Sequence, residues 1–181
     1  MNILINILLF QIGWFACVLG AAYGFPFAGT GIALTIATLH VLRASRPGQE
    51  LKLILISVVI GTAWDSALVA AGLIAYPNGV LLAGTAPIWI AALWVVFATT
   101  MNVSLRWLHS RYLLAAVFGA VGGPLAYFAG AKLGALVFLD ITWALGAQAA
   151  GWAVLMPLLL RIARQLDGIT PARPGSEPCL T

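Results

Sequence analysis

Six long runs of apolar residues, separated by short polar or glycine- and proline-containing stretches, dominate the chain. A helix needs roughly 20 mainly apolar residues to cross about 30 Å of hydrocarbon. The second run is the shortest, so we expect a tilted or partly re-entrant helix there, and the stretch 130–140 is predicted to lie at the membrane interface. The pattern predicts six transmembrane helices, over residues 2–23, 26–42, 53–76, 87–105, 111–129 and 141–162.

The composition indicates the same class of protein. Of the 181 residues, 62% are hydrophobic and only 8% are charged, whereas a soluble domain carries about a quarter charged residues. This excludes a disordered chain and a nucleic-acid-binding module, although nine basic residues stand against five acidic ones. The predicted fold class is therefore all-α, a polytopic membrane bundle of six helices.

The basic residues predict the orientation of this bundle. Eight of the nine lie between spans two and three, between spans four and five, or after span six, and only Lys132 lies on the other side. The positive-inside rule then places both termini in the cytoplasm. Residues 1–164 are predicted to form the bundle, and residues 165–181 a disordered, proline-rich cytoplasmic tail.

Asp65 is the one acidic residue within a predicted span, about twelve residues into the third, close to the bilayer midplane. A carboxylate at that depth costs about 2.5–3.5 kcal/mol to insert, so such residues face the bundle interior and have partners. Two interpretations stay open. Asp65 either belongs to a functional site, which the cost favours, or is a protonated carboxyl that fixes helix register through a hydrogen bond.

Polar and aromatic side chains at similar depth are candidates to surround Asp65. Residues three or four apart share a helix face, which pairs Gln11 with Trp14 on the first helix and Gln148 with Trp152 on the sixth. Amide and indole N–H groups are donors that suit a carboxylate. The predicted ligand-binding residues are Asp65, Trp64, Gln11, Trp14, Gln148, Trp152 and, in the outer half of the fifth helix, Tyr127.

Other polar and aromatic residues are interpreted as ordinary features of a membrane bundle. Trp89 and Trp143 at the outer edge and Trp107 at the inner edge are typical interfacial anchors. His40 and His109 lie at cytoplasmic helix ends and are predicted to belong to no cluster, so neither indicates a metal site. Stripes of small residues on the first, second and fifth helices predict close helix packing or a surface for a partner.

Enzymatic chemistry is disfavoured by what the sequence lacks. There are no histidine boxes and no HExxH, and no glycine-rich phosphate loop or GxSxG elbow. A second carboxylate within a span, which would form an acid/base pair with Asp65, is absent as well. No cofactor is predicted, and Cys17 and Cys179 lie too far apart in the sequence to indicate a metal motif or a disulfide framework.

Several stretches form a recognisable set when taken together. These are residues 10–20, Trp64-Asp65 with Gly72, residues 87–98, residues 104–108 and residues 122–130. The set resembles the bacterial inner-membrane proteins grouped as domain-of-unknown-function family 2878, over about residues 1–165. The resemblance implies a multi-pass protein of the Gram-negative inner membrane, with a link to lipid or envelope physiology, and it supplies no catalytic residue.

Three functions are compatible with these observations. The favoured hypothesis is a small protein that binds or transports an amphipathic or lipid-derived molecule at a mid-membrane polar site around Asp65, acting as a homodimer if it is a carrier. The alternative is a non-catalytic accessory or scaffold subunit of a lipid-modifying membrane system, with a membrane protein as its partner. A membrane-embedded lipid enzyme that uses Asp65 as an acid is the least supported. In each case the surrounding partners are membrane lipids, and no nucleic acid is expected.

Overall fold

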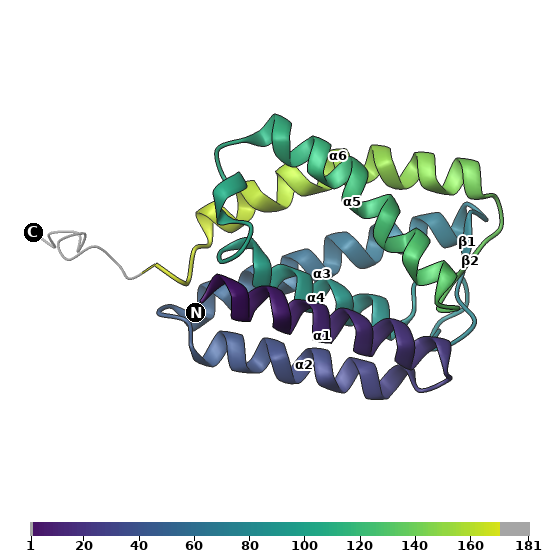
Figure 1. The fold of residues 1–181 in the computed structure, drawn as a ribbon, viewed down its shortest axis with the longest axis horizontal. Helices are drawn as coiled ribbons and strands as arrows, with labels where there is room; N and C mark the ends of the chain where they lie inside the picture. Colours follow the sequence, from purple (N-terminus) through teal and green to yellow (C-terminus); the bar gives the residue numbers. More distant parts are fainter. Residues whose placement is uncertain (1, 171–181) are drawn as a thin grey trace, which may run out of the picture.

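The computed structural model describes residues 2–170 as a bundle of six helices (Figure 1). The helical elements are α1 (Ile3–Ala22), α2 (Pro26–Leu42), α3 (Pro47–Ala70), α4 (Ile88–Met101), the 3-10 turn η1 (Arg106–Leu108), α5 (Tyr112–Lys132) and α6 (Ile141–Gln165). Two short strands, β1 (Ile74–Ala75) and β2 (Val137–Phe138), pair in antiparallel orientation. The all-α prediction is therefore confirmed, with this one small strand pair in addition.

Four of the helices, α1, α3, α5 and α6, are long and apolar enough to cross a membrane. The chain is thus a multi-pass helical membrane protein. The other two, α2 and α4, are shorter apolar helices of 17 and 14 residues. Helix α4 packs against α1, α2 and α3. Most of its side chains are buried in protein, so it is the central helix of the bundle.

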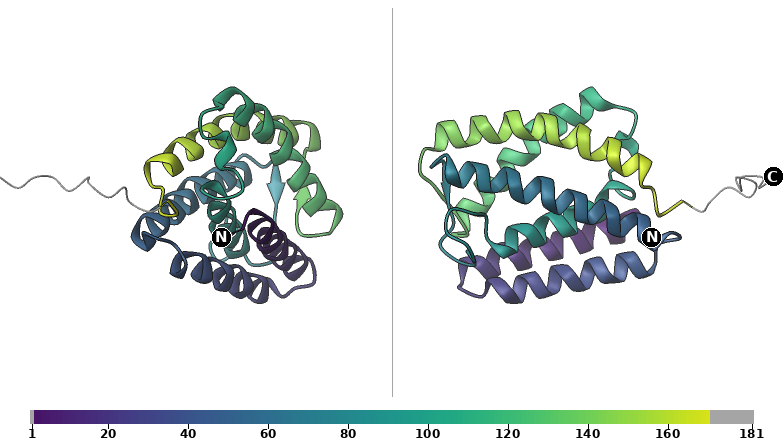
Figure 2. Two further views of the ribbon diagram at one scale, coloured as in Figure 1. Left: turned by 60° about the vertical axis from the view of Figure 1, so that its left-hand side comes forward. Right: turned by 180° about the vertical axis from the view of Figure 1, so that it is seen from behind.

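The helices form two parts, which we call the four-helix unit (α1–α4) and the hairpin (α5–α6). Helix α5 packs mainly against α6, and α6 contacts α3 and α4. In the left view of Figure 2, the start of α5 lies well away from α1, and the two helices approach each other toward the end of α5. The N-terminus and the end of α6 lie at the same end of the molecule, which we call the basic end, and the β1–β2 pair lies at the opposite end, the strand end (Figure 1). The four-helix unit and the hairpin are therefore in contact mainly on one side, where α6 packs against α3 and α4.

Helix α3 is shifted relative to the predicted span 53–76. Pro47 occupies its first turn, where the missing proline N–H is not needed. After Ala70 the chain turns at Gly72, which has a φ of 68°, and continues into β1. Asp65 consequently lies five residues from the end of α3, toward the strand end, rather than at its centre as the predicted boundaries placed it.

Trp89 corrects a second expectation. It is 1% exposed, and its indole N–H donates to the Asn78 carbonyl oxygen at 3.1 Å. The loop between β1 and α4 folds over this ring, so Trp89 is a core residue and not an interfacial anchor. Trp143 and Trp107, by contrast, are 72% and 49% exposed, as interfacial anchors should be.

Small residues bring helix backbones together inside the chain. A Cβ added at Gly29 of α2 would overlap the backbone of Ala16 and Cys17 in α1. A Cβ at Gly119 of α5 would overlap the Trp152 carbonyl of α6. Both small-residue stripes are therefore used for packing within one molecule, as association of helices in lipid requires.

The predicted tail begins where α6 ends. Residues 171–181, which hold its three prolines, lie outside the described residues, as does Met1. Residues 166–170 run back across the basic end, where they contact the four-helix unit.

Candidate ligand-binding site

Asp65 is fully buried and accepts hydrogen bonds from three neutral side chains. The Trp94 indole N–H of α4 donates to its Oδ2 at 2.7 Å. Its Oδ1 accepts from the hydroxyl of Tyr127 in α5 and, at 3.4 Å, from the hydroxyl of Tyr76, just after β1. No charged partner contacts the carboxyl group among residues 2–170. Asp65 therefore joins the four-helix unit to the hairpin and fixes the orientation of one indole and two phenols.

A column of rings and glycines holds these donors in place. The rings of Trp94 and Trp152 are stacked, with centroids 4.9 Å apart and planes 12° from parallel. A Cβ at Gly61 of α3 would overlap the Trp94 ring, and a Cβ at Gly123 of α5 would overlap the Trp152 ring. The order Gly61, Trp94, Trp152, Gly123 thus links α3, α4, α6 and α5 in one close-packed stack. Only glycine leaves room for a ring at either end of it.

The ring of Trp64, the residue before Asp65, packs against a glycine in the same way. A Cβ at Gly151 of α6 would overlap its ring. Its indole N–H donates to Gln148 Oε1 at 3.3 Å, and Gln148 is fully buried. This second contact between α3 and α6 reinforces the junction between the four-helix unit and the hairpin.

A cavity of about 400 Å³ lies between the four-helix unit and the hairpin, beside the stack. Its wall includes one side of α5, where Phe118 and Leu125 are 47% and 61% exposed, and the middle of α1, where Gln11 is exposed. The cavity therefore opens sideways between α1 and α5, at the level of the helix middles. The residues that line it are Phe10, Gln11, Trp14, Ile90, Leu93, Trp94, Phe97, Phe118, Gly119, Gly122, Gly123, Leu125, Ala126, Tyr127, Trp152 and Met156.

The structure distributes the predicted site residues over two layers. Gln11, Trp14, Tyr127 and Trp152 line the cavity. Asp65 lies behind this wall, and it reaches the cavity only through Tyr127 and Trp94, both of which line it.

Trp64 and Gln148 are paired in the junction and do not line the cavity. Of the predicted residues, only Tyr127 bonds to Asp65 directly; the amide groups of Gln11 and Gln148 do not.

Two donors to Asp65 were not predicted. Trp94 lies in a continuous apolar run of α4, where nothing in the sequence distinguishes a hydrogen-bonded indole from a packed one. Tyr76 falls at the end of the predicted third span, but it lies in the loop after β1, where its hydroxyl reaches Asp65. One signal in the sequence could have indicated both residues. A buried carboxyl group needs hydrogen-bond donors, and the chain has only a small number of Trp and Tyr side chains that can supply them.

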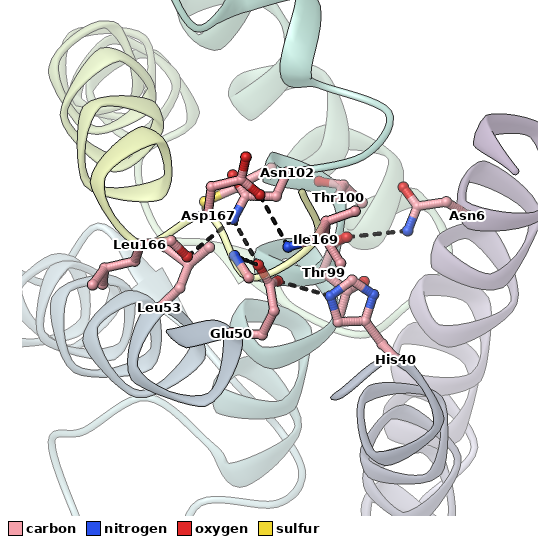
Figure 3. Close-up of polar contacts among 12 residues, drawn as sticks. Asn6, His40, Glu50, Leu53, Thr99, Thr100, Asn102, Leu166, Asp167 and Ile169 are labelled. Carbon is pink, nitrogen blue, oxygen red and sulfur yellow. Dashed lines mark hydrogen bonds and ion pairs between the residues drawn. The ribbon is translucent and has the colours of Figure 1, made fainter. Parts of the chain in front are cut away.

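A second buried carboxyl group, Glu50 of α3, lies at the basic end (Figure 3). Glu50 Oε2 lies 2.8 Å from His40 Nε2 of α2, and Oε1 accepts from Asn102 Nδ2 at 2.8 Å and from the Gly168 backbone N–H at 2.9 Å. His40 and Asn102 are 3% and 0% exposed. The prediction that His40 belongs to no cluster is therefore wrong, because the α2–α3 turn brings it against the first turn of α3.

The segment after α6 is clamped at the same end. Arg106 donates from Nη1 and Nη2 to the two carboxylate oxygens of Asp167, both at 2.9 Å. Partial burial alone would raise the pKa of Asp167, but hydrogen bonds from Arg106, from the Thr170 hydroxyl and from two backbone N–H groups outweigh it. They hold the pKa of this carboxyl well below its usual range. In the described part of the chain, no group of three or more His, Cys, Asp and Glu side chains could hold a metal ion.

A family described as Protein of unknown function (DUF2878) matches residues 3–158. The match covers the cavity, the Asp65 network and most of α6, and it confirms the resemblance inferred from the sequence. Searches of curated proteins and of solved structures found no match for the chain.

Proposed function

The chain belongs to the DUF2878 family, whose description assigns no activity, and we propose from its geometry that it binds a small amphipathic or lipid-derived molecule in the cavity between α1, α4, α5 and α6. The observation that carries this proposal is the cavity itself, about 400 Å³ and mostly apolar, beside a fixed polar network. Ligand pockets of about 300–1,000 Å³, lined by apolar and aromatic groups with a few placed polar atoms, are typical of small-molecule sites.

The proposal includes the arrangement of the protein in the membrane. All six helices cross, the shorter α2 and α4 included, with the termini in the cytoplasm of a bacterial inner membrane. The distribution of charge supports this, because Arg43, Arg46, Arg106 and Arg111 gather at the basic end and Lys132 lies at the strand end. The opening between α1 and α5 then faces the hydrocarbon of the bilayer, so the ligand arrives from the lipid.

In this proposal Asp65 acts as a positioning residue. Its carboxyl is closed off from the cavity by Trp94 and Tyr127, and it holds both side chains in the orientation that shapes the wall. An unmade hydrogen bond on a buried donor is costly. Loss of the carboxyl would therefore free the indole and the phenol to move into the cavity. Transport of the ligand across the membrane and assembly with a second copy stay predictions.

The test is native mass spectrometry of the gently solubilised protein, with extraction and identification of what it carries. Gly122 lines the cavity and a Cβ there meets nothing within 4 Å. Gly122→Phe should thus fold and occupy the cavity. Gly31 of α2 is equally open but is not part of the cavity wall, so Gly31→Phe is the matched control.

The expected result is a defined small molecule held by the wild type and by Gly31→Phe, and lost from Gly122→Phe. If all three proteins carry the same bulk phospholipid and nothing else, the cavity is not a binding site and the proposal fails.

A further inference from the structure

We propose that the ligand of this cavity is uncharged: a largely hydrocarbon molecule whose polar group is a neutral oxygen, such as a hydroxyl or a carbonyl. This inference rests on the proposed function, and it narrows an amphipathic or lipid-derived ligand to one chemical class. Three observations carry it.

The first observation is the absence of charge from the wall. Among residues 2–170, no Asp, Glu, Lys, Arg or His lines the cavity. The nearest carboxyl, Asp65, is fully buried, and its oxygens already accept from Trp94, Tyr76 and Tyr127. An ion brought into this space would lose its hydration and gain no opposite charge, and an uncompensated ion in a low-dielectric site is strongly unfavourable.

The second observation is the route. The cavity opens between α1 and α5 beside Gln11 and Leu125, which lie near the middles of their helices and are exposed to the surroundings of the bundle. In a bilayer those surroundings are hydrocarbon. A molecule that enters there must bring its polar group through the hydrocarbon as well as its chain. This transfer is costly for a charged group and much less costly for a hydroxyl or a carbonyl.

The third observation is the polar group that the wall does offer. Gln11 lines the cavity and is exposed. Its side-chain amide can both donate and accept, and so can pair with a hydroxyl or a carbonyl. A neutral oxygen on the ligand therefore has a partner on this wall, whereas a fixed charge has no opposite charge there among the described residues.

The experiment compares four probes of equal chain length: tetradecanol, tetradecane, tetradecyl sulfate and tetradecyltrimethylammonium. The sulfate and the ammonium group keep their charges at neutral pH. The full chain is reconstituted in lipid nanodiscs, and the amount of each probe retained is measured by mass spectrometry against empty nanodiscs, which removes the contribution of the bilayer. Gly122→Phe and Gly31→Phe serve as the blocked variant and the control.

We expect tetradecanol to saturate near one molecule per protein, at least tenfold more tightly than either ion and more tightly than tetradecane. Gly122→Phe should abolish this retention, and Gly31→Phe should keep it. Equal or tighter binding of an ion in the wild type, blocked by Gly122→Phe, would overturn the uncharged class and leave the proposed function standing.

If tetradecane binds as tightly as tetradecanol, the neutral oxygen of the ligand does not contribute to binding, and that part of the inference is overturned. Retention of all four probes at the level of empty nanodiscs would overturn the proposed function, and this inference with it.

Discussion

Asp65 and Glu50 are both fully buried carboxyl groups of α3 with three hydrogen-bonding partners each, but their partners differ in kind. Glu50 is bound by a histidine in the last turn of α2, the amide at the C-terminal end of α4 and a backbone N–H after α6. Asp65 is bound by Trp94 and Tyr127, which line the cavity, and by Tyr76, which does not. Both carboxyl groups therefore tie chain segments together, and Asp65 in addition orients two side chains of the cavity wall.

Burial by itself therefore does not distinguish the two carboxyl groups, which are both 0% exposed. The contacts of Glu50 account for it fully as a structural junction at the basic end, where four segments meet. Asp65 differs in that two of its partners line a cavity, and this is why the proposed function gives it a positioning role. A series of substitutions tests whether the fold and the site can be damaged independently.

Glu50→Ala should have the largest effect on stability. It leaves the Asn102 amide and the Gly168 N–H without their buried acceptor and His40 without its partner, and breaking a buried charged hydrogen-bond network costs about 3 kcal/mol or more. Denaturant unfolding in mixed detergent micelles measures the loss. A free energy of unfolding equal to that of the wild type would remove the distinction between the two carboxyl groups.

Gly61→Ala should damage the site more than the fold. The added methyl group overlaps the Trp94 ring, which must leave its place in the stack and its hydrogen bond to Asp65. Overpacking of this kind costs about 1–3 kcal/mol, and ligand retention in the native mass spectrum should disappear.

Gly31→Ala, which meets no neighbouring atom, is the control and should behave as the wild type does. If Gly61→Ala retains the ligand, the stack does not shape the cavity.

Asp65→Asn should lower the free energy of unfolding by about 1–2 kcal/mol and weaken ligand binding several-fold. The amide has one acceptor oxygen where the carboxylate has two, so it can accept from the Trp94 indole or from the Tyr76 and Tyr127 hydroxyls, but not from both sides. In either orientation a buried donor loses its acceptor, which costs about 1–3 kcal/mol, and the wall changes shape. Titration of a ligand identified by mass spectrometry, monitored by tryptophan fluorescence, measures the affinity. Unchanged affinity would assign Asp65 to helix register alone.

Asp167→Asn should have the smallest effect, under about 1 kcal/mol, because the Arg106 side chain is 39% exposed and exposed ion pairs contribute little. The pKa of Asp167 is lower in the folded protein than its ordinary value of 3.8. Its contribution to stability is therefore complete above about pH 5 and is lost as the pH falls below that value toward the folded pKa.

The difference in unfolding free energy between the wild type and Asp167→Asn, measured from neutral pH down to about pH 3, should be constant at first and then shrink. A difference that grows on acidification would contradict a stabilising contact between Arg106 and Asp167.

The amino-acid sequence predicts much of this molecule because apolar run length and charge placement are strong signals in membrane proteins. The six helices lie close to the predicted segments, apart from α3. The prominence of Asp65 came from its contrast with apolar neighbours, and it led to Tyr127, Trp152, Gln11 and Trp14 on or near the same cavity. Glu50 has no such contrast, since Arg46 and Lys52 flank it in the sequence, and its burial could not be inferred.

The contacts between particular helices could not be predicted from the sequence, for a physical reason. A helical pattern gives the face of a side chain but not the neighbour that the face meets, so Trp94 could not be distinguished from a packing residue. Tyr76 required the path of the loop after α3, which depends on the turn at Gly72 and the β1–β2 pair.

The parallel indoles of Trp94 and Trp152 give the protein an intrinsic optical signal. Two such chromophores 4.9 Å apart couple electronically, so their joint transition should add to the far-ultraviolet circular dichroism spectrum an exciton couplet that neither ring would give alone. One ring belongs to the four-helix unit and the other to the hairpin. This signal therefore reports, without any label, whether the four-helix unit and the hairpin keep the packing in which Trp94 stacks on Trp152.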